Sequence, residues 1–326
     1  MAYQADKGPH PLAALVGVLA TSVFAAHAGA ATGGVVVTGH VLQGETGRPV
    51  AGAQVRVLGM ETGQQPVERL TRTGADGRFT LRVDVLRRTY VIQTEYRGVV
   101  YTSGPHPADR RTLDATLRVY EVTDDPGGLY IARRALLVEQ AEPHALDIRE
   151  VVVVGNALPR TYVGQPEGDG RATLRLPLPA GAQGVSVRQG MAPLGLDAEG
   201  AVVDSLPITP GERQIVLTYR VPFRGTRVAL RIPVQLPTLA ADVFVAAPLS
   251  AHSDALPRRE ERTVQQRRVL RLAGANLPPG TTIELRLSGP TRPTANVLPA
   301  VGIATLALLV FWAAALPWLR TLRTPT

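Results

Sequence analysis

Histidine, cysteine, lysine and acidic residues perform most of the chemistry in proteins. In this chain, their number and spacing do not indicate a functional site. The six histidines lack the spacing of metal ligands and are far apart in the sequence: His10, His27, His40, His106, His144 and His252. There is no cysteine, which excludes thiol catalysis, zinc ribbons and iron–sulfur centres. The only lysine is Lys7, so a phosphate-binding loop of the Gly-x-x-x-x-Gly-Lys type is absent.

Three short segments contain ligand or triad residue types. Asp124-Asp125 and the acidic loop 167–170 offer oxygen ligands for calcium, but we interpret both as solvated turns. His252-Ser253-Asp254 contains the residue types of a hydrolytic triad, yet neighbours in sequence cannot adopt triad geometry, and no Gly-x-Ser-x-Gly elbow occurs. The sequence therefore predicts no catalytic, cofactor-binding or metal-binding residue, and no cofactor. We expect that the protein is not an enzyme, and an enzyme with dispersed active-site residues is the competing hypothesis.

Aromatic and basic residues give weak indications of a ligand. Core or interface packing is the default for the tyrosines, and Tyr96 and Tyr101, which flank an expected hairpin turn, are the best candidates for an exposed, sugar-binding pair. The net charge is +8, nearly all of it from arginine. Attraction to anionic lipid headgroups or wall polymers is one interpretation of this charge. A compositional bias is the preferred one, because the arginines are scattered among acids. With 5% aromatic residues and no basic stripe, a nucleic-acid partner is not expected.

Both ends of the chain are apolar. Residues 297–319 contain no charge and precede Arg320 and Arg323, and about 20 apolar residues match a hydrocarbon core of ~30 Å when helical. We therefore expect a transmembrane helix at 297–319 with a cytoplasmic tail at 320–326, and a buried core helix is the alternative. Residues 1–31 are predicted to be a signal peptide or an N-terminal anchor. These features predict a single-pass protein of the cell (inner) membrane, with the bulk of the chain extracytoplasmic, in the periplasm or at the cell surface.

Between these ends, the hydrophobic pattern predicts β-strands. Apolar and polar residues alternate in short runs such as 35–42, 53–57 and 79–83, and glycine-rich turns separate the runs. Sustained helical periodicity is missing. The expected fold is mainly β, with tandem antiparallel β-sandwiches and one C-terminal transmembrane helix. The expected order is a first sandwich at 33–119, a second at 120–248, a linker at 249–262 and a short β segment at 263–289. That last segment either forms a stalk or adds to the second sandwich.

Two turns in the first module resemble a known family. Residues 39–55 read Gly-His-Val-Leu-Gln-Gly-Glu-Thr-Gly-Arg-Pro-Val-Ala-Gly-Ala-Gln-Val, and residues 73–79 read Thr-Gly-Ala-Asp-Gly-Arg-Phe. This pattern is similar to the carboxypeptidase regulatory-like domain, over about a quarter of the chain. The resemblance implies a transthyretin-like, immunoglobulin-type sandwich that acts as an accessory module, without chemistry of its own. Asp76 is expected to cap the second turn, and Phe79 to enter the core.

These features predict a membrane-anchored extracytoplasmic binding or scaffold protein without catalytic activity. Its expected partners are the membrane lipid bilayer and a protein of the cell envelope. The alternative is an accessory subunit of a membrane complex, such as an export, respiratory or cytochrome-assembly machine. Small residues at Ala300, Gly302 and Ala304 would permit close packing of the membrane helix in such a complex.

Overall fold

The computed structural model describes residues 34–289, apart from 109–110, 143, 169 and 265–266. The predicted signal or anchor at 1–31, transmembrane helix at 297–319 and tail at 320–326 lie outside the described residues. Within the described part, the chain is mainly β, with several sheets and one short 3-10 turn, η1 (Pro126–Gly128). No helix in that part is long and apolar enough to cross a membrane.

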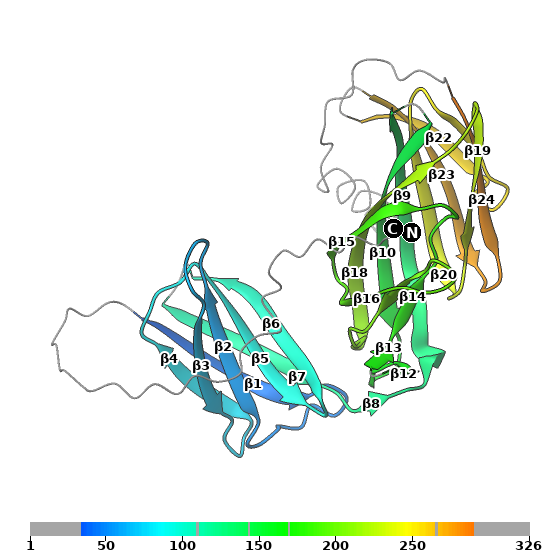
Figure 1. Ribbon diagram of the computed structural model, residues 1–326. Helices are drawn as coiled ribbons and strands as arrows, with labels where there is room; N and C mark the ends of the chain where they lie inside the picture. Colours follow the sequence, from blue (N-terminus) through cyan, green and yellow to red (C-terminus); the bar gives the residue numbers. More distant parts are fainter. Residues whose placement is uncertain (1–33, 109–110, 143, 169, 265–266, 290–326) are drawn as a thin grey trace, which may run out of the picture. The chain divides into compact units, whose positions relative to one another are not determined.

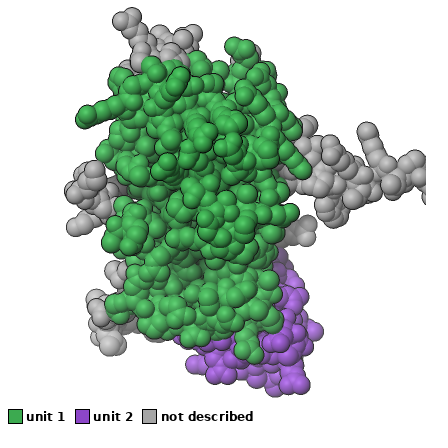
Figure 2. Space-filling model, turned by 90° about the vertical axis from the view of Figure 1, so that its right-hand side faces the viewer, with its two compact units in different colours: residues 1–5, 123–326 green, residues 6–122 purple. Residues whose placement is uncertain are grey.

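The chain divides into two compact units, with the boundary between Val122 and Thr123 (Figure 2). We call the described residues 34–122 the N-terminal unit and the described residues 123–289 the C-terminal unit. The second unit extends beyond the module expected at 120–248, because the strands after residue 248 pair within it.

The N-terminal unit contains two sheets, with strand orders β4-β1-β7 and β3-β2-β5-β6 (Figure 1). Strands β1 and β7 pair in parallel, and the other pairs within these sheets are antiparallel. Both sheets bury one face, since apolar residues alternate with polar ones, as β7 shows with its strict exposed–buried alternation. The strands are β1 (Val35–Gln43), β2 (Gln54–Met60), β3 (Val67–Arg72), β4 (Arg78–Val83), β5 (Thr89–Tyr96), β6 (Val99–Pro107) and β7 (Thr112–Val119).

The second turn of the resemblance motif forms as the sequence predicts. The carboxylate of Asp76 accepts a hydrogen bond from the backbone N–H of Arg78 at 3.0 Å. Gly77 follows with φ +73°, a conformation that a side chain disfavours. Phe79 is 3% exposed and lies in the core. The turn therefore delivers β4 to the sheet with its apolar side chains facing inward.

The C-terminal unit is built on a seven-stranded sheet of order β15-β18-β10-β9-β20-β23-β22 (Figure 1). Its strands are β9 (Leu129–Glu142), β10 (Ala145–Asn156), β15 (Gln183–Gln189), β18 (Gly211–Pro222), β20 (Thr238–Ala246), β22 (Arg258–Val264) and β23 (Arg267–Leu277). Strands β9 and β20 pair in parallel, although about a hundred residues separate them in sequence. Contacts between strands far apart in sequence, and not hairpins alone, therefore hold this sheet together.

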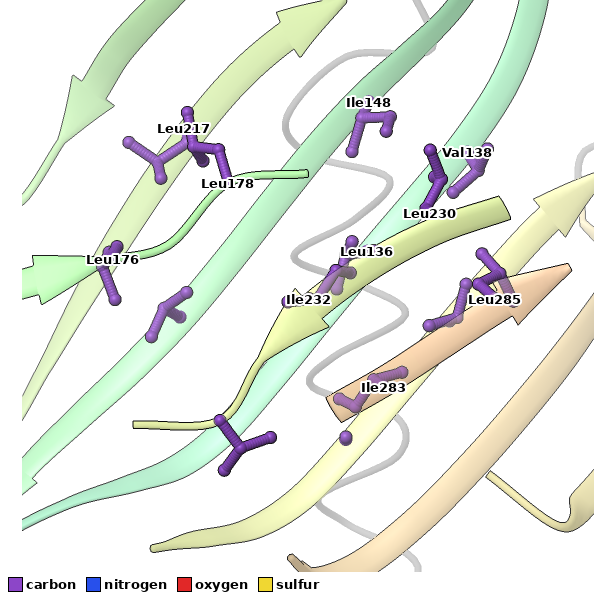
Figure 3. Close-up of a cluster of buried hydrophobic side chains, with 14 of the residues drawn as sticks. Leu136, Val138, Ile148, Leu176, Leu178, Leu217, Leu230, Ile232, Ile283 and Leu285 are labelled. Carbon is purple, nitrogen blue, oxygen red and sulfur yellow. The ribbon is translucent and has the colours of Figure 1, made fainter. Parts of the chain in front are cut away.

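Two three-stranded layers complete the C-terminal unit, with orders β19-β24-β21 and β14-β17-β16. Apolar side chains of β9 and β10 face those of β19 and β24 and form the main core (Figure 3). The added strands are β14 (Leu174–Leu176), β16 (Pro193–Leu196), β17 (Val202–Asp204), β19 (Arg227–Pro233), β21 (Ser250–His252) and β24 (Thr282–Ser288). Two short ladders join β8 (Val122–Thr123) to β11 (Thr161–Tyr162) and β12 (Gln165–Glu167) to β13 (Gly170–Ala172).

The structure corrects the linker expected at 249–262. This segment contains β21 and most of β22, and both strands are paired within the C-terminal unit. The prediction was wrong because β22 is an edge strand. Edge strands often carry charged side chains, which gives them the composition of a loop. Segment 263–289 contains β23 and β24, so it adds to the second unit and does not form a stalk.

Candidate binding groove

The outer face of the β19-β24-β21 layer carries a regular array of polar side chains. Cross-strand pairing aligns Arg227 with Ser288 and Ser250 in one row, and Ala229 with Arg286 and His252 in the next. Residues between these positions point the other way, toward the core, because successive side chains of a strand alternate. We call these six residues the platform.

Hydrogen bonds and ion pairs order one side of the platform. The hydroxyl groups of Ser250 and Ser288 lie 2.7 Å apart. Arg286 pairs with Glu284 at 2.8 Å and with Asp254 at 3.5 Å. Its hydrogen bond to Glu284 raises the pKa of Arg286 and lowers the pKa of Glu284. Arg286 is therefore a fixed cation, held by acids on its own strand and on the loop after β21.

A groove of about 560 Å³ runs over the platform and is also lined by Arg259 of β22. A second hollow of about 240 Å³ shares Ser250 and Arg259 and continues to Arg268 and to one acid, Glu261. Within the described ranges, Arg227, Arg259 and Arg268 have no ion-pair partner. Guanidinium groups of this kind bind phosphate or carboxylate through paired hydrogen bonds, and nearby serine hydroxyls add donors. The groove is thus suited to hold an anion.

The triad residue types at 252–254 do not come together. His252 Nε2 lies 2.9 Å from Asp254 Oδ1, but both side chains are exposed. Ser253, between them, is 4% exposed, and its hydroxyl has no hydrogen-bond partner in the described structure. The alternation of the strand turns Ser253 toward the interior and His252 toward solvent. The geometry offers no activated nucleophile at this position.

The remaining sequence candidates serve local structure. His40 is half-buried on β1, and His106 lies 3.1 Å from the hydroxyl of Ser103. His144 contacts the ring of Phe223 edge-on. The carboxylate of Asp125 accepts a hydrogen bond from Gly127 N–H and caps η1. In the part of the chain that the structure describes, no group of three or more histidine or acidic side chains could hold a metal ion.

Tyr96 and Tyr101 pack within the N-terminal unit, which is the default that the sequence gives for these tyrosines, and they do not form an exposed pair. Tyr101 is 4% exposed and donates a hydrogen bond to the carbonyl of Tyr120. Tyr96 donates to Glu121 at 2.7 Å, and this hydrogen bond raises its pKa. The guanidinium of Arg97 lies over the Tyr96 ring at 5.5 Å. The candidate sugar-binding pair therefore does not form, because the strand alternation of β6 directs Tyr101 inward.

A buried charge cluster in the C-terminal unit was missed by the sequence analysis. Glu150 on β10 is fully buried and accepts hydrogen bonds from Arg134 Nε at 2.6 Å and Tyr219 OH at 2.8 Å. Arg134 also donates to the carbonyl group of Pro177, just after β14, and to that of Pro233, the last residue of β19. Burial and the Glu150 charge raise the pKa of Tyr219 well above its ordinary value. The cluster cross-links three strands and the opposite layers, so we assign it a structural role.

A second buried pair lies beside β17. Asp204 is fully buried and pairs with Arg213 at 2.6 Å, and it also accepts hydrogen bonds from the backbone of Ala192 and Leu206. Burial raises the pKa of Asp204 and lowers the pKa of Arg213. All polar contacts of this carboxylate are made within the protein, which again indicates structure and not ligand binding.

The chain matches no protein-family model and no curated protein sequence. Comparison with solved structures gives partial similarities. An M1 zinc metallopeptidase from Deinococcus radiodurans aligns over 49% of this chain and 42% of its own, at 16% identity and TM-score 0.32. A 9R-lipoxygenase from Cyanothece aligns over 32% and 20%, at 17% identity and TM-score 0.23. The aligned part spans about half or less of these chains, and similarities at this level assign neither a fold family nor an activity.

Proposed function

We propose that this protein is a membrane-anchored, extracytoplasmic binding or scaffold protein that has no catalytic activity of its own. The observation that carries the proposal is the groove over the platform, where arginine and serine side chains converge. The apolar segment 297–319, followed by Arg320 and Arg323, supports anchoring in the inner membrane.

We further propose that the N-terminal unit is a carboxypeptidase regulatory-like sandwich. The Gly-containing turn at 73–78 and the seven strands in two sheets, with β1 and β7 in parallel, support this assignment. As an accessory module, it would position the C-terminal unit or contact a partner of its own. No peptidase activity follows from the resemblance.

Site-specific photocrosslinking tests the binding function. A photoreactive amino acid replaces Ala229, which is exposed and lines the groove, and a matched control replaces Thr80, which is exposed on β4 of the other unit. We expect membrane-fraction adducts at position 229 in intact cells that are absent at position 80. Equal labelling at both positions, or recovery of the full chain as a cytosolic protein, would contradict the proposal.

The second candidate function, an accessory subunit of a membrane complex, is favoured by the small residues Ala300, Gly302 and Ala304. Replacing segment 297–319 by an unrelated membrane helix separates the two candidates. Retained crosslinking at Ala229 together with retained cellular function supports the binding protein. Loss of function with unchanged membrane attachment supports the subunit.

A further inference from the structure

One end of the C-terminal unit collects strand termini from both layers. Strand β19 begins at Arg227, β24 ends at Ser288 and β21 begins at Ser250, and these three residues are cross-strand neighbours. Short links join this end to the seven-stranded sheet, from β18 to β19 and from β20 to β21. Gly289, the last described residue, donates to the carbonyl of Thr226 at 3.2 Å. We call this the exit end, because the chain leaves it toward segment 297–319.

The exit end is basic, although the arginines that make it so are far apart in sequence. Arg224, Arg227 and Arg268 are exposed there, and none has an ion-pair partner within the described structure. The hydroxyl groups of Ser250 and Ser288 lie in the same row as Arg227. At the opposite end, the corresponding links 234–237 and 278–281 contain no charged residue. Acids also lie at this end: Glu139, Glu142 and Asp147 pair with other arginines, and Glu261 lines the hollow beside Arg268, so the unpaired arginines outnumber the unpaired acid.

The exit end is also the part of the unit that the sequence ties most closely to the apolar segment. Seven residues, 290–296, separate Gly289 from Val297. Even fully extended, this connection spans about 29 Å at most, at 3.3–3.6 Å per residue. If 297–319 crosses the bilayer, the exit end lies within that distance of the membrane surface.

We propose that the exit end binds the phosphate groups of anionic phospholipids in the membrane that anchors the chain. This inference rests on the proposed membrane anchoring. Arg224, Arg227 and Arg268 supply guanidinium groups that pair with phosphate oxygens, and the hydroxyl groups of Ser250 and Ser288 donate further hydrogen bonds. Binding there would orient the strands of the C-terminal unit roughly along the membrane normal, so that the opposite end points away from the membrane.

Hydrogen–deuterium exchange of the full chain in lipid nanodiscs tests this assignment. Discs of phosphatidylcholine alone are compared with discs that also contain phosphatidylglycerol. We expect the peptides covering 223–230 and 284–289 to exchange more slowly in the anionic discs than in the neutral discs. Since one arginine at an anionic surface changes binding about five-fold, the double variant Arg227→Ala/Arg268→Ala should lose most of this protection.

The matched control removes the same charge from the other unit. Arg111 and Arg118 are exposed in the N-terminal unit, so Arg111→Ala/Arg118→Ala should keep the protection. The charge-conserving variant Arg227→Lys/Arg268→Lys should retain part of it, which excludes loss through misfolding. Equal exchange in both kinds of disc overturns the proposal.

The two possible sources of phosphate are separated by adding millimolar inorganic phosphate to the neutral discs. If the same peptides are then protected, the ligand is a soluble phosphate compound and the lipid assignment is wrong. Failure of the full chain to enter nanodiscs overturns membrane anchoring and the lipid assignment together. Entry without protection overturns the lipid assignment alone and leaves the proposed function standing.

Discussion

Replacing Glu150 by glutamine should strongly destabilise the C-terminal unit. Glutamine fits the same space but removes the negative charge that faces Arg134 Nε at 2.6 Å. Arg134 is 5% exposed, and its other hydrogen bonds go to the neutral carbonyls of Pro177 and Pro233. The substitution therefore leaves a buried cation without a counter-charge. Breaking a buried pair in this way costs about 3–5 kcal/mol.

Removing the charges of both Arg134 and Glu150 should reduce the free energy of unfolding less than removing the charge of Glu150 alone. In Arg134→Met/Glu150→Gln no buried charge remains, and the glutamine carbonyl can still accept the hydrogen bond of the Tyr219 hydroxyl. Two carbonyl groups lose a donor, which costs about 1–3 kcal/mol for each one that stays buried and unsatisfied. The bond to Pro233 is long, at 3.4 Å, so its loss is the smaller of the two. We expect the double variant to be more stable than Glu150→Gln.

The assay is thermal unfolding of the full chain, followed by hydrogen exchange of peptides from each unit. At roughly 2–4 °C per kcal/mol for a unit of this size, Glu150→Gln should lower the melting temperature of the C-terminal unit by about 6–20 °C. The N-terminal unit serves as the internal reference and should not shift.

Glu142→Gln is the matched control, because the Glu142 side chain is 57% exposed and pairs with Arg220 at 3.0 Å. Its loss should cost about 0–1 kcal/mol. The reasoning is refuted if Glu150→Gln costs no more than Glu142→Gln, or if the double variant is less stable than Glu150→Gln.

Three further predictions concern separate parts of the fold. Burial raises the pKa of Tyr219 above its ordinary 10.0, so the unfolded chain loses this proton first, and the stability of the C-terminal unit should fall as pH rises above about 10. Tyr219→Phe should flatten that part of the profile of melting temperature against pH, and an unchanged slope would argue against the assignment. Asp204→Asn removes the counter-charge of Arg213, whose side chain is 18% exposed, and should cost about 2–3 kcal/mol, less than Glu150→Gln. Urea unfolding measures this cost, and a neutral result would show that the pair is dispensable. Gly39→Ala places a Cβ 1.9 Å from the carbonyl oxygen of Ala115 on the parallel neighbour β7, so β1 and β7 must separate. We expect a loss of about 1–3 kcal/mol, seen as faster hydrogen exchange in the N-terminal unit only.

The sequence by itself determined the strand content and the direction of most side chains. Period-2 alternation placed Phe79 in the core, and the Thr-Gly-Ala-Asp-Gly-Arg segment predicted the turn that Asp76 caps. Both are local properties, because backbone geometry alone sends successive side chains to opposite faces. The charged edge strand β22 escaped the same analysis, since a strand with one partner and one solvent-facing edge has the composition of a loop.

Only the tertiary structure decided which strands become neighbours. The pairing of β9 with β20 brings together residues about a hundred positions apart. Arg134, Glu150 and Tyr219 meet for the same reason, and Arg227 reaches Ser250 and Ser288 only through cross-strand alignment. No sequence window contains these groups together, so unpaired arginines that are scattered along the chain come to lie at one end of a unit only when the sheet assembles. Alternation is fixed by the geometry of one strand, whereas strand order and alignment depend on packing across the whole unit.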